Sequence, residues 1–232
     1  MKFLDQMPAC LAAALLASSA SAPGQDNKFD YDEIAQKTFW EKLYPEGGWT
    51  LYCGFHFGMD RQTADGRAIA IEHVYPTELM LKVAGCANRS ECRDSGNPRF
   101  AKMEADMHNL YPVWQAMITF RAGRMFGMVT GEDWRFDDCD IEWKDKVIEP
   151  RVLARGNVAR AILYMRATYG VPVDPPELQL LRRWNAEDPP SEQEKERNDL
   201  IETVQGTRNS FIDASVRAES FKQGVPQDLD ER

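Results

Sequence analysis

The sequence contains few of the residues that build common catalytic and metal sites. Its 232 residues include only three histidines, His56, His73 and His108, and five cysteines. It has neither a Cys-x-x-Cys motif nor a pair of histidines at ligand spacing, which argues against a zinc site. Beyond the first two dozen residues, no apolar run approaches the length of a membrane-spanning helix. We therefore expect no membrane anchoring.

The first 22 residues have the pattern of a secretory signal peptide. Lys2 precedes an apolar run from Ala9 to Ala17, and small residues follow this run up to Ala22. The run is too short to span a membrane, and the pattern predicts cleavage after Ala20 or Ala22. We divide the chain into a signal peptide at 1–22, a folded domain at 23–216 and a polar tail at 217–232 that we expect to be disordered. The mature protein is expected to be secreted or periplasmic, and monomeric.

Removal of the signal peptide leaves an even number of cysteines, which in an oxidising compartment suggests two disulfides. Four cysteines allow three pairings, and free buried thiols are a further alternative. Cys86 and Cys92 close a short loop, so a bond between them is our first choice. Cys53 and Cys139 would then form the second bond.

The net charge of −9 disfavours a nucleic-acid partner if it is taken as a sum. The charge is unevenly distributed, however. Residues 185–232 carry twelve acidic and six basic residues, whereas residues 150–184 carry six arginines and two acidic residues. The acidic excess therefore lies mainly near the C-terminus, and a basic stretch precedes it.

Hydrophobic and charged contents of 43% and 28% are those of a chain with a substantial core, and the length fits one domain. Apolar periodicity predicts helices at 31–45, 154–170, 175–185 and 191–206. A further helix is expected to begin near residue 99 and to be interrupted by Pro112. Residues 49–55 and 68–76 are rich in β-prone residues and predict strands, and residues 86–99 predict a loop.

The strand at 68–76 places an acidic residue directly before a histidine. In a regular strand Ile69, Ile71 and His73 share one face, and Glu72 faces the other way. Pro76 ends the strand. Either this is an ordinary strand end with an exposed acid and a half-buried histidine, or a bend brings Glu72 and His73 to one metal and one water.

Several residues near this strand have side chains suited to metal-assisted hydrolysis. Glu72 is a hard oxygen donor suited to Mg²⁺ or Ca²⁺, and Asn109 is a neutral oxygen donor. A neutral imidazole at His73 can take a proton from a water, and an arginine in the intervening loop can hold a phosphate. We interpret His56 as a strand or turn residue and His108 as a hydrogen-bonded support.

Five stretches, "YCG", "EHVYP", "KMEADMHNLYP", "ARGNVARAILYM" and "VQGTRNSF", occur in the order and approximate spacing of the endonuclease I family. The resemblance covers roughly residues 35 to 215. Members of that family are secreted or periplasmic non-specific nucleases that cut DNA and often RNA and leave 5′-phosphate ends. The resemblance implies an α+β, mostly helical fold with a ββα-metal (His-Me finger) core. It also implies dependence on Mg²⁺, with Ca²⁺ and Mn²⁺ as alternatives.

The resemblance assigns roles to individual residues. Glu72 and Asn109 would bind the metal, His73 would be the general base, and Arg89 would stabilise the transition state. We expect nucleic acid to be contacted by three further arginines, Arg121, Arg155 and Arg160. For Arg160 a buried structural ion pair is the alternative, and Arg155 is expected to precede the helix.

The sequence departs from the family pattern at a few positions. Phe55 stands where the family has a second cysteine. In the run after His-Asn-Leu, Ala116 and Ile118 replace a glutamate and an asparagine, whereas Arg121 is kept. The alternative function is therefore a catalytically weakened member that binds nucleic acid or a protein partner outside the cytoplasm.

Overall fold

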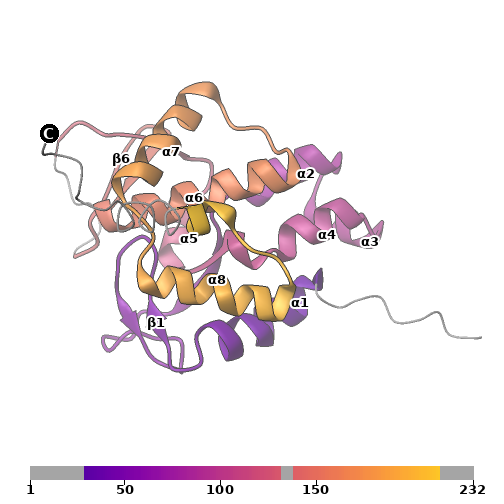
Figure 1. Cartoon of the computed structure of the whole chain (residues 1–232), viewed down its shortest axis with the longest axis horizontal. Coiled ribbons are helices and arrows are strands. Elements are labelled where there is room, and N and C mark those ends of the chain that lie inside the picture. Colours follow the sequence, from indigo (N-terminus) through magenta and orange to yellow (C-terminus); the bar gives the residue numbers. More distant parts are fainter. Residues whose placement is uncertain (1–28, 132–137, 215–232) are drawn as a thin grey trace, which may run out of the picture.

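The computed structural model describes residues 29–131 and 138–214, so the predicted signal peptide and the tail at 217–232 lie outside the described residues. Helices and short strands alternate along the chain (Figure 1), which confirms an α+β fold. The helices are α1 (Tyr31–Glu33), η2 (Ile34–Leu43), α2 (Thr77–Ala84), α3 (Arg89–Asp94), α4 (Pro98–Ala105), η3 (Met107–Asn109), α5 (Gln115–Arg121), α6 (Val152–Tyr169), α7 (Pro175–Glu187) and α8 (Glu192–Gln205). The strands are β1 (Gly48–Trp49), β2 (His56–Phe57), β3 (Ile69–His73), β4 (Leu110–Trp114), β5 (Met125–Phe126), β6 (Ile141–Lys144) and β7 (Val147–Pro150).

The strands form small separate sheets. Strand β1 pairs with β2, β3 pairs antiparallel with β4, and β7 lies between β5 and β6. The β3–β4 register runs from Ile69 opposite Trp114 to His73 opposite Leu110, and α5 packs on both strands. The predicted strand around Glu72 is confirmed, and it ends before Pro76.

The helix expected to run on from residue 99 is shorter than predicted. Helix α4 ends at Ala105, and the Asp106 side chain accepts a 3.0 Å hydrogen bond from the His108 amide, which starts a separate turn, η3. Strand β4 then passes through Pro112. Proline is tolerated in this strand because it lacks only the backbone N–H donor. Its carbonyl still accepts a 2.8 Å hydrogen bond from the Leu51 amide.

Two further predictions for the N-terminal half are wrong. Residues 49–55 do not form one strand, because a tight turn brings the Gly54 amide to the Thr50 carbonyl at 2.9 Å, with Gly54 at φ +67°. The segment 86–99 is not only a loop, since it contains α3. The Asn88 side chain caps that helix by accepting a 2.9 Å bond from the Glu91 amide.

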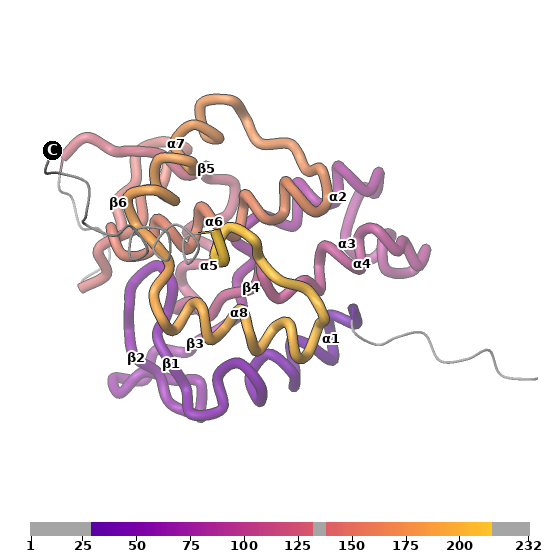
Figure 2. The backbone as a smooth tube through the Cα atoms, viewed as in Figure 1, coloured from indigo at the N-terminus to yellow at the C-terminus, as the bar shows by residue number. Residues whose placement is uncertain are grey.

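The helices predicted in the C-terminal half are confirmed, and α6 forms much of the core. Helix α6 lies near the centre of the molecule and packs along α7 (Figure 1). Its residues from Val158 to Met165 are all buried. We had expected Arg155 to precede this helix. Because α6 begins at Val152, Arg155 lies inside it instead. The short helices α2, α3 and α4 pack together at one side, beside α1 (Figure 2).

Both predicted disulfides are present in the structure. Cys53 is bonded to Cys139 and Cys86 to Cys92, with S–S distances of 2.08 and 1.96 Å. The first bond ties the turn after β1 to the segment before β6, and the second joins the end of α2 to α3. Across residues 29–131 and 138–214, none of the helices has the length and apolar character needed to cross a bilayer.

Candidate active site

Strand β3 carries both residues of the predicted Glu-His pair, and both are largely buried. Glu72 is 7% exposed and His73 is 9% exposed. The strand runs through both residues in regular register, so the bend that we expected at this pair falls after His73. Because neighbouring side chains of a strand point to opposite faces, Glu72 and His73 have separate sets of partners.

The His73 ring is oriented by the backbone of α4. Its Nε2 atom lies 2.8 Å from the carbonyl oxygen of Glu104. A carbonyl only accepts hydrogen bonds, so Nε2 carries the hydrogen and Nδ1 is the nitrogen left to accept a proton. Burial lowers the pKa of His73 to about 4, although the bond to the Glu104 carbonyl opposes this shift. The imidazole is therefore neutral at pH 7, as a general base must be.

The Glu72 carboxylate is incompletely paired. The Tyr52 hydroxyl lies 3.4 Å from Oε1, and Arg121 Nε lies 3.6 Å from the same oxygen, and both distances are long for a hydrogen bond. Burial raises the pKa of Glu72 to about 7, while the charge of Arg121 and the bond from Tyr52 act to lower it. A buried carboxylate with such weak partners calls for a further positive charge.

Asn109 fixes the chain just after β3. Its Oδ1 accepts a 2.7 Å bond from the Tyr75 amide, its Nδ2 donates to the Tyr75 carbonyl at 3.0 Å, and its own carbonyl accepts from Val74 at 3.0 Å. Asn109 thus holds the bend that follows His73. An amide oxygen has two lone pairs, so Oδ1 keeps one for a cation. Glu72 and Asn109 are therefore donors of the right kind for a hard divalent ion.

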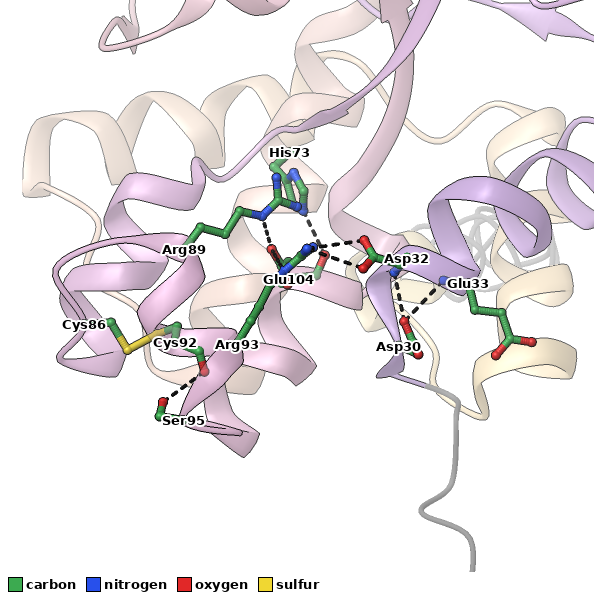
Figure 3. A network of polar contacts seen from close by, with 10 residues as sticks. All are labelled: Asp30, Asp32, Glu33, His73, Cys86, Arg89, Cys92, Arg93, Ser95 and Glu104. Carbon is green, nitrogen blue, oxygen red and sulfur yellow. Dashed lines mark hydrogen bonds and ion pairs between the residues drawn. A yellow bond between two sulfur atoms is a disulfide. The ribbon is translucent and has the colours of Figure 1, made fainter.

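Arg89 is held by the same residue that orients His73. Arg89 Nε donates to the Glu104 carboxylate, and Arg93 Nε donates to it at 3.0 Å (Figure 3). Glu104 is 2% exposed, so these two arginines neutralise a buried charge. Arg89 Nη2 is buried and, within the part of the chain that the structure describes, has no hydrogen-bond partner. It is therefore a donor available to an anion close to His73.

Two of the three arginines predicted to contact nucleic acid are buried. Arg160 is 1% exposed and forms a buried ion pair with Glu194, with Nε 2.7 Å from Oε1, so the predicted phosphate contact is wrong and the structural alternative holds. Arg121 is 4% exposed and lies against Glu72, where it cannot meet a phosphate at the surface. The Arg155 side chain keeps 20% of its exposure while pairing with Glu149, so its predicted role stays a prediction.

The other two histidines lie where a structural role is expected. His56 is exposed on β2, edge-on to Trp49. His108 is fully buried with Nε2 3.1 Å from the Thr207 carbonyl, and burial lowers its pKa to about 4. The sequence reasoning missed Glu104 altogether, although it lies in the quoted stretch "KMEADMHNLYP".

The arrangement of His73, Glu72 and Arg89 defines a class of site. A neutral imidazole with one free nitrogen, an under-paired carboxylate and an arginine with a free donor can activate a water and hold an anion. A profile of the Endonuclease I family matches residues 27–216. The chain belongs to this family.

Three deoxyribonucleases and endonucleases are similar to the chain over more than two thirds of its length. The chain is 28% identical over 225 residues to an extracellular deoxyribonuclease of Aeromonas hydrophila, covering 88% of this chain and 96% of that protein. A periplasmic deoxyribonuclease of the same species is 30% identical over 194 residues, covering 74% and 81%. An Endonuclease-1 of Buchnera aphidicola subsp. Acyrthosiphon pisum (strain APS) is 27% identical over 165 residues, covering 69% and 64%.

Proposed function

We propose that the protein is a secreted or periplasmic, metal-dependent endonuclease. It hydrolyses phosphodiester bonds in DNA and RNA without regard to sequence and leaves 5′-phosphate ends. The observation that carries the proposal is a neutral His73, oriented by the Glu104 carbonyl, one residue from the under-paired carboxylate of Glu72. Membership of the family and the extracellular and periplasmic deoxyribonucleases among the relatives support the reaction class and the location.

The antiparallel pair β3–β4, with α5 packed on both strands, is the part of the fold that we assign to the ββα-metal (His-Me finger) core. The strand β3 supplies Glu72 and His73 to it, and the turn before β4 supplies Asn109. The α2–α4 segment between the two strands supplies Arg89 and Glu104. This division places the proton acceptor on a rigid strand and the anion-binding group on a helix beside it.

Glu72 and Asn109 would hold the metal, for which we propose Mg²⁺. Both offer oxygen donors, which Ca²⁺ and Mn²⁺ also accept. Two protein ligands leave the rest of an octahedral shell to water and phosphate oxygen, as is usual for Mg²⁺ in proteins. When bound, the ion supplies positive charge to the scissile phosphate and to the leaving oxygen.

The chain's own residues would perform the proton transfer and the binding of the phosphate. A water attacks the phosphorus and gives its proton to His73 Nδ1, while Nε2–H stays on the Glu104 carbonyl and keeps the ring in place. The bond between phosphorus and the 3′-oxygen breaks, and this oxygen takes a proton from solvent. The phosphate stays on the 5′-end. Arg89 Nη2 donates to a phosphate oxygen as negative charge builds up on it.

Two of the positions that differ from the family pattern, Ala116 and Ile118, lie on α5, which also carries Arg121. Ala116 is exposed on α5 and Ile118 is half-buried, whereas Arg121, which is kept, contacts Glu72. This placement favours an active enzyme over the alternative of a weakened member that only binds.

The decisive experiment is digestion of supercoiled plasmid and of RNA with Mg²⁺, with and without EDTA. We expect cleavage that EDTA abolishes, and products that polynucleotide kinase labels only after phosphatase treatment. His73→Ala tests the site, and His56→Ala is the matched control because His56 is an exposed histidine on another sheet. If the protein bound DNA but cut it with none of Mg²⁺, Mn²⁺ and Ca²⁺, the binding function would replace the enzymatic one.

A further inference from the structure

We propose that Tyr31 is a positioning residue of this site, holding His73 and Arg89 in their working orientations. The proposal rests on the roles given above to those two residues. Tyr31 comes from α1, at the start of the described chain and far in sequence from β3 and α3. None of the motifs that identify the family includes it.

The Tyr31 ring contacts both proposed functional residues. It stacks on the His73 imidazole with ring centroids 5.2 Å apart and planes inclined by 28°. The Arg89 Cζ atom lies 4.6 Å from the Tyr31 ring centroid, within the range of a cation–π contact. Glu104 contacts the same two residues, through its carbonyl and its carboxylate. His73 and Arg89 are thus each held by Tyr31 and by Glu104.

Tyr31 is itself anchored and is not a loose side chain on the surface. The Asp30 side chain caps α1 by accepting hydrogen bonds from the backbone amides of Asp32 and Glu33, at 3.0 and 3.2 Å (Figure 3). Asp32 forms an ion pair with Arg93 at 3.3 Å. Ile34, at 3% exposure, belongs to a hydrophobic cluster in which η2 packs with residues of β2, β3, α4, η3, β4 and α8, and Tyr31 packs against this cluster. These contacts fix the ring on the site.

An aromatic ring supplies what an aliphatic side chain of similar size cannot. A single hydrogen bond at Nε2 leaves the His73 ring free to tilt about that bond, and a stacked flat face removes this freedom. The same face attracts the guanidinium of Arg89, which lies over it, and the Tyr31 hydroxyl is close enough to Arg89 for a hydrogen bond from it to oppose the rise in the Tyr31 pKa that burial causes. Tyr31 also lines one wall of a cavity of about 500 Å³ beside Arg93 and Glu104, so the ring borders an open space.

The test separates the face of the ring from its hydroxyl group. Tyr31→Phe keeps the face, whereas Tyr31→Leu and Tyr31→Met fill the space without one. We expect the phenylalanine variant to keep kcat and KM for plasmid DNA within about threefold of wild type. The leucine and methionine variants should lose about tenfold or more in kcat, with little change in KM, because misplaced catalytic groups slow the chemical step.

Phe29→Leu is the matched control. Phe29 lines the same cavity and packs against the same hydrophobic cluster. Its ring faces the Lys102 ammonium, whereas the Tyr31 ring faces His73 and Arg89. It should leave kcat and KM unchanged. Thermal unfolding of each variant, measured before the assay, identifies those that are folded at the assay temperature.

Three results would overturn the proposal. Wild-type kcat in the folded leucine or methionine variant would show that the ring positions nothing. Equal losses in the phenylalanine and leucine variants would assign the effect to the hydroxyl, and a higher kcat/KM in the leucine variant would mean that the ring obstructs the site. His73→Ala, assayed alongside, keeps the two proposals apart. If it is inactive while Tyr31→Leu is normal, only the positioning role of Tyr31 fails. If it is fully active, the general-base role of His73 fails and the positioning proposal fails with it, whereas the endonuclease function is tested by the plasmid digestion itself.

Discussion

Replacing Glu72 with glutamine should stabilise the metal-free protein at pH 8 and remove its response to Mg²⁺. The substitution keeps the shape of the side chain and deletes a charge whose hydrogen-bonding and charged partners within residues 29–131 and 138–214, Tyr52 and Arg121, lie at 3.4 and 3.6 Å. Such a charge costs free energy to bury, and the protein would keep it because the metal needs it.

The magnitude follows from the pKa of Glu72, which burial raises from 4.5 to about 7. The folded state therefore binds the proton more tightly than the unfolded state. Below pH 4.5 both states are protonated and the carboxyl costs nothing; the cost grows as pH rises toward 7 and is constant above it. At about 1.4 kcal/mol per pKa unit, the full cost is about 3 kcal/mol. Glutamine is neutral throughout and avoids this cost.

Urea unfolding in EDTA at pH 5 and pH 8 measures the difference. Glu72→Gln should be more stable by less than about 1 kcal/mol at pH 5, where the unfolded carboxyl is already partly ionised, and by up to about 3 kcal/mol at pH 8. His73 and His108 titrate in both proteins and cancel. Mg²⁺ at a hundred times its dissociation constant should stabilise the wild type by about 2.7 kcal/mol and the variant hardly at all.

Glu149→Gln is the matched control, since Glu149 is also buried, at 5% exposure, but is paired with Arg155. Losing that charge should destabilise the protein and leave the Mg²⁺ response intact. The reasoning about Glu72 fails if Glu72→Gln is the less stable protein at pH 8 in EDTA, since Arg121 would then already satisfy the charge. Equal stabilisation of both proteins by Mg²⁺ would place the metal elsewhere.

Four further outcomes are expected. His73→Ala should lower the cleavage rate by about 10²–10⁴-fold while plasmid binding persists in a gel-shift assay; wild-type turnover would exclude it as the base. Asn109→Asp, which keeps an oxygen ligand, should need less Mg²⁺ for half-maximal activity than Asn109→Ala. Identical Mg²⁺ titration curves for the two variants would show that Asn109 is not a metal ligand. Serine at both Cys86 and Cys92 opens a loop with a sequence separation of 6 and should cost about 2 kcal/mol in denaturant unfolding. Arg155→Ala, made in the His73→Ala protein, should flatten the slope of log K for DNA binding against log salt concentration by about 0.9. An unchanged slope would show that Arg155 only forms the ion pair with Glu149 and contacts no phosphate.

The sequence predicted those parts of the fold whose signals are local. Apolar periodicity located α6, α7 and α8, and alternation located β3 with the Glu72–His73 pair at its end. Both disulfides followed from the count of cysteines, the compartment and one short loop. The family resemblance, carried by several spaced motifs, was confirmed by a match that covers most of the chain.

The missed features depend on contacts between distant segments. Strand β4 contains Pro112 and has no alternating pattern of its own. Its conformation is decided by antiparallel pairing with the distant strand β3, from Ile69 opposite Trp114 to His73 opposite Leu110. Helix α3 is a few residues long and starts at an Asn cap inside a Gly/Ser-rich stretch. Tyr31 and Glu104 could not be connected to His73 from spacing, because a side-chain stack and a carbonyl bond leave no periodic trace.

The arginine-rich stretch at 150–184 shows that a local excess of charge in a sequence does not predict the electrostatic potential at the protein surface. Arg160 compensates a buried glutamate, and Arg155 pairs with another. Two arginines beside His73, Arg89 and Arg93, come from a segment with acidic neighbours, and they share one buried carboxylate, Glu104. Arg93 also pairs with Asp32, whose side chain is 66% exposed, so solvent screens much of the charge of that carboxylate. A phosphate arriving beside His73 therefore meets positive charge even though the chain carries −9 overall.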